Sequence, residues 1–168
     1  FGYERESKIF LEYHLPAEEA GEILNNTNGY YWRNRWFKPK HKEEVKVYYS
    51  TRGALRTYVH QIPEDASGDS LTQGNALNAA QFFLVGTIGI DIQDWELIES
   101  KTEKLKNRWD HEFEWKEKSF NIKESNHILT VKVQGDQIGY YNERIKLPET
   151  WKLKYEKIRS KNNLLESI

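Results

Sequence analysis

The segment VKVQGD at residues 131–136 is followed by IKLPE at 145–149, and the same pattern occurs earlier, where VKVYYSTRG at 45–53 is followed by HQIPE at 60–64. Each copy has the composition of a strand, a turn marked by glycine, and a second strand that ends before Pro-Glu. The chain therefore contains an internal repeat. Each copy predicts an antiparallel hairpin.

An aromatic and charged strand is expected upstream of each hairpin, at 30–37 (YYWRNRWF) and at 109–115 (WDHEFEW). In the second of these, alternation places His111, Phe113 and Trp115 on a packed face, and it places the neighbouring acidic residues on a solvated face. A further strand is predicted at 95–99. Residues 101–107 are expected to form a polar connection.

Each aromatic strand follows a predicted helix. The first helix begins near Pro16 and ends near Gly29, with Ala20, Ile23 and Leu24 on one buried face. The second has Ser70 or Thr72 as its N-cap and ends at Gly86 or Gly89. Its apolar stripe consists of Ala76, Leu77, Ala80, Phe83 and Leu84.

The order of these elements predicts an α+β fold made of tandem, duplicated helix-plus-antiparallel-sheet modules. We expect the first repeat at 1–66, the second at 67–148, and a basic amphipathic helix at 149–168. This last helix has two interpretations: a linker that enters a membrane span with its cationic face against lipid headgroups, or a helix that closes the core.

Composition excludes several classes of function. Lys and Arg total 25 against 26 Asp and Glu, a net charge of −1, so no bulk positive field attracts nucleic acid. Cysteine is absent, which excludes disulfides, a thiolate nucleophile and Cys-ligated metals. The apolar run at 82–85 is too short to span a bilayer. Because the chain begins with Phe1, we expect it to be part of a longer protein.

Aromatic and basic residues are concentrated in 30–37, and this concentration allows two interpretations. The strand either forms a stacking platform for an extended peptide, a sugar or a single strand, or it packs its aromatics under the first helix. Alternation places Trp32 and Trp36 on the same face. The candidate contact residues are Trp32, Arg33, Arg35 and Trp36.

His111, between Asp110 and Glu112, is the strongest candidate for metal or acid–base chemistry. On a strand, however, the imidazole points away from both carboxylates, and Trp115 stands where an H-E-x-x-H motif needs its second histidine. We therefore expect a histidine that faces the core. The remaining histidines are expected at the surface or partly packed, and they are His14, His41, His60 and His127. No catalytic residue and no metal ligand is predicted.

The duplicated helix-plus-sheet pattern and the run from Ile145 through Trp151 to Asn162 carry a resemblance. The halves resemble PepSY-like domains, which are small extracytoplasmic modules related in architecture to cystatins. The whole chain resembles the soluble region that precedes the transmembrane domain in large bacterial CAAX-type (CPBP) intramembrane metalloproteases. Its landmarks are residues 32–39, the turn at 62–66, residues 107–111 and the exit at 159–162.

The resemblance implies a non-catalytic sensing, regulatory or substrate-presenting domain on the extracytoplasmic face of a bacterial membrane. Its partners would be a protein or peptide and the parent transmembrane domain. The catalytic pattern of that family, a Glu-Glu pair with an Arg and separated histidines on membrane helices, has no counterpart here, since Glu18-Glu19 and Glu43-Glu44 lie in polar segments. No cofactor is implied in this chain, and any metal belongs to the parent membrane domain. The alternative is a free-standing small-molecule or carbohydrate-binding protein.

Overall fold

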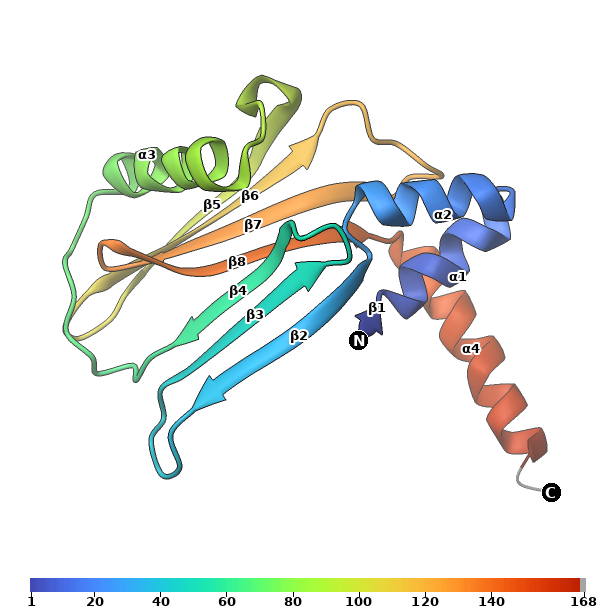
Figure 1. The fold of residues 1–168 in the computed structure, drawn as a ribbon, viewed down its shortest axis with the longest axis horizontal. Helices are drawn as coiled ribbons and strands as arrows, with labels where there is room; N and C mark the ends of the chain where they lie inside the picture. Colours follow the sequence, from blue (N-terminus) through green and yellow to red (C-terminus); the bar gives the residue numbers. More distant parts are fainter. Residues whose placement is uncertain (167–168) are drawn as a thin grey trace.

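An eight-stranded antiparallel sheet, in the order β1-β2-β3-β4-β8-β7-β6-β5, forms the centre of the computed structural model, which describes the backbone of residues 1–166 and the side chains of residues 1–160 (Figure 1). The strands are β1 (Gly2–Tyr3), β2 (Tyr30–Phe37), β3 (Glu44–Ser50), β4 (Leu55–Gln61), β5 (Trp95–Lys104), β6 (Trp109–Glu117), β7 (Asn126–Gln134) and β8 (Gln137–Lys146). The helices are α1 (Arg5–His14), α2 (Ala17–Asn26), α3 (Gln73–Phe83), the π-helical turn η1 (Leu84–Ile88), the 3₁₀ turn η2 (Ile92–Asp94) and α4 (Glu149–Glu166). The α+β class predicted from the sequence is confirmed.

Two meanders of strands meet in the middle of this sheet. β2, β3 and β4 pair in sequence order, and so do β5, β6, β7 and β8. The last strands of the two meanders are antiparallel neighbours, with Tyr58 of β4 opposite Tyr141 of β8. A single hydrogen-bonded sheet therefore runs through both halves of the chain.

Helix α3 covers one face of this sheet over β6, β7 and β8. Ala76, Ala80 and Leu84 are completely buried. They pack against a cluster formed by Phe113, Trp115, Leu129, Val131, Val133 and Tyr141. The small side chains on the helix allow its backbone to approach the sheet closely.

The ends of α3 follow the sequence signals. The Thr72 hydroxyl accepts a hydrogen bond from the Asn75 N–H at 3.3 Å, as an N-cap does. Beyond η1, Gly89 has φ 81° and donates to the Leu84 carbonyl at 3.0 Å. Of the two predicted N-caps, Thr72 is therefore the one that caps α3. Of the two predicted ends, Gly89 is the one that ends the helical segment.

A second core joins α1 and α2 to the end of β8. Its buried residues are Phe10, Leu11, Ala20, Leu24, Ile145 and Leu147. The helix predicted from Pro16 is α2, whose Ala20 and Leu24 are buried. No helix was predicted at α1, although this helix contributes Phe10, the largest buried side chain of the cluster.

The connection between the two halves is held by Arg108, which is almost completely buried. Its guanidinium pairs with Asp110 at 2.9 Å and donates to the carbonyls of Pro63 and Ala66 at 3.0 and 2.8 Å. The neighbouring Asn107 amide donates to the Asp65 carbonyl at 2.6 Å. Two of the landmark segments, 62–66 and 107–111, thus contact each other directly. Asp110 was expected on a solvated face and is instead buried.

The expected polar connection at 101–107 is wrong over its first half. Strand β5 continues to Lys104, with Lys101 opposite Glu112 and Lys104 opposite Trp109. β5 is the outer strand of the sheet, so its backbone pairs with β6 on one side only. Its side chains are mostly exposed. An outer strand is held by backbone pairing and needs no apolar alternation. The apolar pattern therefore placed the end of this strand too early in the sequence.

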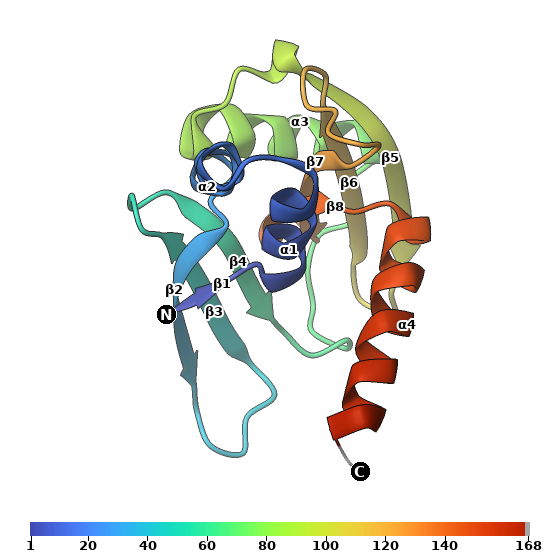
Figure 2. The same cartoon turned by 90° about the vertical axis from the view of Figure 1, so that its right-hand side faces the viewer.

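Helix α4 runs out from the sheet, and its last turns stand clear of the other elements (Figures 1 and 2). At its base the Trp151 ring meets Phe10 edge-on at 5.1 Å and stacks on Tyr155. Further along, Leu153 and Ile158 are 65% and 50% exposed. Within residues 1–166, none of the helices has the length and apolar character needed to cross a bilayer.

Candidate functional site

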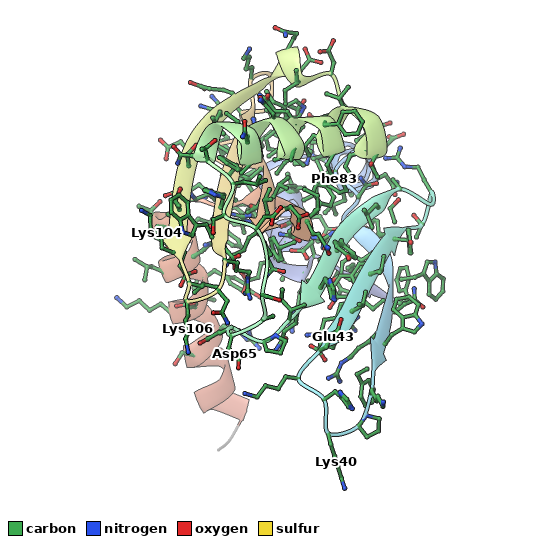
Figure 3. All side chains as sticks on the ribbon, turned by 90° about the vertical axis from the view of Figure 1, so that its left-hand side faces the viewer. Lys40, Glu43, Asp65, Phe83, Lys104 and Lys106 are labelled. Carbon is green, nitrogen blue, oxygen red and sulfur yellow. The ribbon has the colours of Figure 1, made fainter. Side chains whose placement is uncertain are left out.

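Strand β2 forms an open edge of the sheet. Among the strands that the structure describes, its only outer neighbour is the two-residue β1, which pairs with Tyr30 and Tyr31. From Trp32 to Phe37, no described strand lies on the outer side of β2. The edge leads into the β2–β3 hairpin, whose tip carries Lys40 at the end of the molecule away from α3 (Figure 3). An unpaired edge of this kind is a template for another strand.

Alternation fixes which backbone groups of β2 are free. The Thr51 N–H donates to the Tyr30 carbonyl at 3.1 Å, so residue 30 directs its backbone groups toward β3. The β2–β3 register runs from Tyr31 to Phe37 without a shift. Because successive residues of an antiparallel strand point their backbone groups to opposite sides, Arg33, Arg35 and Phe37 direct their N–H and C=O groups outward.

The structure divides the four predicted contact residues into two pairs. Trp32 and Trp36 lie on one face of β2, each 55% exposed, and Arg33 and Arg35 lie on the other. The expected packing under the first helix is therefore wrong for both tryptophans. Tyr30 instead packs against the core that α1 and α2 form, whereas Tyr31, on the opposite face, is buried and stacks on Tyr48 with ring centroids 5.4 Å apart.

Arg35 is held in place by neighbours on its own face. Its Nε donates to Glu44 at 2.7 Å, and its guanidinium lies 4.6 Å above the Phe37 ring. Lys46 and, to a lesser extent, Arg35 lower the pKa of Glu44 by hydrogen bonding to its carboxylate. The open edge thus presents two aromatic side chains on one face and an ordered cation on the other.

His111 faces the core, as predicted. Its Nε2 lies 2.8 Å from the Leu71 carbonyl and its Nδ1 lies 3.0 Å from the Thr102 hydroxyl. A carbonyl only accepts, so Nε2 donates to Leu71, and Nδ1 lies within hydrogen-bonding distance of the Thr102 hydroxyl. Both ring nitrogens are therefore occupied. In the part of the chain that the structure describes, no group of three or more His, Asp or Glu side chains is arranged to hold a metal ion.

The face opposite α3 carries a second ion pair that the sequence analysis placed in solvent. Glu114 is only 8% exposed and lies against Arg144, while the Thr130 hydroxyl donates to it at 3.1 Å. Burial alone raises the pKa of Glu114, but the hydrogen bond and charge of Arg144 outweigh it and lower the pKa. These residues line a shallow cavity of about 480 Å³ on the open sheet face.

A buried cluster around His127 is the feature that the sequence analysis missed. Its Nδ1 lies 2.7 Å from the Glu117 carboxylate, and its Nε2 lies 2.9 Å from Glu143. The rings of Trp95 and Phe120 flank the imidazole, with centroids 5.1 and 5.6 Å away. The expectation that His127 lies at the surface or is partly packed is wrong, because its exposure is 6%.

The two carboxylates set the charge of this cluster. Burial alone lowers the pKa of His127, but the hydrogen bonds and charges of Glu117 and Glu143 outweigh it, so the pKa is raised. The pKa of Glu117 is lowered, mainly by its hydrogen bond with His127. The cluster therefore places one imidazole, whose protonated form is favoured, between two acidic side chains.

A cavity of about 510 Å³ opens beside this cluster, on the face of the sheet that α3 covers. Its polar lining includes His127, Glu143, Asn28 and Tyr141, which come from β7, β8 and the segment after α2. One alternation signal in the sequence pointed to it, because His127 has the same parity as Leu129, Val131 and Val133 of β7. Nothing in the sequence pointed to Asn28.

Comparison with protein-family models, with curated proteins and with solved structures gives no match to this chain.

Proposed function

We propose that this chain is a non-catalytic binding domain that captures an extended peptide by adding it as a strand to the open edge of β2. Through this edge it senses a protein or presents it to a membrane-embedded CAAX-type protease in the same polypeptide. The observation that carries the proposal is the unpaired segment from Trp32 to Phe37, with its outward backbone groups and exposed aromatics. The role needs no cofactor in this chain, and any metal would belong to the parent membrane domain.

The two faces of β2 define the peptide that this edge would select. Backbone hydrogen bonds to Arg33 and Arg35 provide affinity, and the side chains of an added strand alternate between the two faces. One set meets Trp32 and Trp36, and the other meets the guanidinium groups. The favoured peptide therefore alternates apolar or aromatic residues with acidic ones.

We further propose that the fold is a duplication of PepSY- or cystatin-like modules, with repeats at 1–66 and 67–148. Each half contains a helix followed by an antiparallel meander, and the last strands of the two meanders are neighbours. These observations support the proposal together with the repeated hairpin sequences.

The proposed location is the extracytoplasmic face of a bacterial membrane, with α4 as the exit helix toward the transmembrane domain. Exposed apolar side chains on α4, Leu153 and Ile158, alternate with Lys152, Lys154 and Lys157. This pattern suits a helix beside lipid headgroups.

Substitution of Arg35 by proline tests the peptide site. Because the Arg35 N–H points outward, Arg35→Pro removes a donor for the incoming strand and no hydrogen bond to β3. Arg35→Ala is the matched control, since it removes the same side chain and keeps the N–H. The probe is a phage-displayed library of linear ten-residue peptides, followed by titration calorimetry of the enriched sequences.

We expect enriched peptides to lose most of their affinity for Arg35→Pro and to lose less for Arg35→Ala. Bound peptide should also slow amide hydrogen exchange at Arg33, Arg35 and Phe37. A library that yields no binder, or a peptide that binds the proline variant as well as the alanine variant, would refute strand addition at β2.

A free-standing carbohydrate- or small-molecule-binding protein is the second candidate, favoured by the exposure of Trp32 and Trp36 on one face. It predicts that a soluble sugar or lipid quenches tryptophan fluorescence in the wild type and not in Trp32→Ala. The mass of the native protein, recovered from membrane and soluble fractions, separates the two candidates. A much larger membrane-bound product supports the protease domain, and a soluble product of about 20.0 kDa supports the free-standing protein.

A further inference from the structure

The cavity beside His127 has unused hydrogen-bonding capacity. Among the described side chains, the Tyr141 hydroxyl and the Asn28 Oδ1 are buried and have no partner. Tyr141 has 0% exposure, and its pKa is raised by burial, so its phenol stays neutral. The Asn28 amide nitrogen donates to Glu143 at 2.8 Å, which leaves its oxygen as an acceptor. Buried polar atoms without partners are costly, and both of these residues line the cavity.

The charge of the cavity selects against anions. Glu117 and Glu143 flank the single imidazole of His127, so the cluster has one more acidic group than basic groups. Each oxygen of Glu143 already accepts one hydrogen bond, from His127 and from Asn28, and each retains a lone pair. Arg56, whose charge acts on Tyr141, is paired with Glu4 at 2.7 Å and lies over the Tyr31 ring. Arg52, next to Gly53 of the lining, is exposed and is engaged with the Asn25 carbonyl and the Asn26 side chain. Water screens the charge of Arg52, and Glu4 compensates that of Arg56, whereas Glu143 is 5% exposed.

Most of the remaining lining is apolar or aromatic. Its apolar and aromatic residues include Tyr49, Leu55, Ile88, Ile90, Trp95 and Leu129. Aromatic faces attract cations, and an aliphatic wall accommodates a hydrocarbon body. A ligand that satisfies the whole lining therefore combines an apolar body with a head group that is positively charged and donates hydrogen bonds.

We propose that this cavity is a binding site for a small organic amine in its ammonium form. The ammonium group donates to the Asn28 Oδ1, the Tyr141 hydroxyl and Glu143, and the apolar body lies against Ile88, Ile90 and Trp95. A quaternary ammonium has no N–H for the free acceptors, and a carboxylate is repelled by Glu143. The site is separate from the β2 edge and does not rest on the capture of a peptide there.

Three small probes of the same shape test the chemistry. They are 2-phenylethylamine, 2-phenylethanol and phenylacetate, titrated by calorimetry at pH 7 with amide chemical shifts as the second readout. We expect the amine to bind at least about tenfold more tightly than the other two, since only it makes charge-assisted hydrogen bonds. The largest shifts should fall at His127, Tyr141 and Glu143.

Two adjacent tyrosines of β8 provide a matched pair of variants. Tyr141→Phe removes the unpartnered hydroxyl of a residue that lines this cavity, and Tyr140→Phe removes the hydroxyl of a residue that lines the cavity on the opposite face of the sheet. We expect Tyr141→Phe to weaken amine binding about tenfold and Tyr140→Phe to leave it unchanged. Because Tyr141→Phe deletes a buried unpartnered group, its melting temperature should equal or exceed that of the wild type.

Two further variants keep the proposal open to refutation. Ile90→Trp fills the cavity from its apolar wall without altering a polar group, and it should abolish amine binding. Arg35→Pro at the β2 edge should leave amine binding unchanged, which separates this site from the proposed peptide site. Binding of phenylacetate or phenylethanol as tightly as the amine, the absence of amine binding, or equal effects of the two tyrosine variants would each overturn the proposal.

Discussion

Strands β2 and β6 look alike in sequence and differ in their surroundings. Both alternate aromatic with charged residues, and both precede a hairpin with the same pattern. In β6, Phe113 and Trp115 are 0% and 1% exposed, whereas Trp32 and Trp36 of β2 are each 55% exposed. The same local pattern therefore produces a core strand in one half of the molecule and an exposed edge in the other.

Coverage by a helix explains this difference. α3 lies across β6, β7 and β8, and β6 also has a strand on each side. In the first half, α2 packs with α1 against the end of β8, so most of β2 is left uncovered. Periodicity identifies a strand, and its burial is decided by which helix the topology places over it.

The largest test of this comparison is the same substitution in both strands. Trp115→Ala should lower the free energy of unfolding by about 3–5 kcal/mol, because it empties a fully buried site. Trp36→Ala, on the exposed edge, should lower it by about 0.5 kcal/mol. Urea unfolding followed by circular dichroism measures both values. Similar losses for the two variants would show that β2 is covered in solution and would remove the basis of the peptide site.

The second test concerns His127, which belongs to the buried half. His127→Gln leaves Glu117 and Glu143 without their cation and should lower the free energy of unfolding by about 3 kcal/mol. The control is His60→Gln, which removes an exposed pair with Glu43 in the first half and should have a much smaller effect.

The effect of His127→Gln should depend on pH in a defined way. The pKa of His127 is raised above its ordinary value of 6.5, so its contribution is complete below 6.5 and is lost as the pH rises through the folded-state pKa. The pKa of Glu117 is lowered below 4.5, so its contribution is complete above 4.5 and is lost as the pH falls through its folded-state pKa. The difference between wild type and variant should therefore be greatest between pH 4.5 and 6.5. A difference that does not change with pH would mean that His127 is neutral in the folded protein.

Much of the fold was available from the sequence because it is encoded locally. The two hairpins, the boundaries of α2 and the Thr72 cap of α3 each depend on a few neighbouring residues. α1 was missed because charged residues surround its buried Phe10 and Leu11. Strand β5 was cut short because a polar outer strand is held by backbone pairing, which leaves no apolar pattern to detect.

The candidate sites depended on information that is not local. Trp32, Arg33, Arg35 and Trp36 were singled out by composition, but only the strand order shows that they lie on an open edge. Similarly, Glu117, His127 and Glu143 lie on three strands and have no recognisable spacing in the sequence. Alternation places all three on the α3 side of the sheet, and pairing of β6, β7 and β8 then brings them together.

The smallest expected effect is at the edge itself, where Arg35 and Lys46 both contact Glu44. Lys46 makes the larger contribution to the lowered pKa of Glu44, so Lys46→Ala should raise that pKa more than Arg35→Ala does. The contribution of the lowered pKa of Glu44 to stability is complete above pH 4.5 and is lost as the pH falls through the folded-state pKa, so the stability of both variants should differ from that of the wild type less as the pH falls. Carboxyl chemical shifts of Glu44, followed by NMR against pH, measure the order of the two effects. If Arg35→Ala produced the larger change, the Arg35 guanidinium would be more tightly bound to Glu44 than the structure indicates, and it would be less available to the proposed acidic peptide.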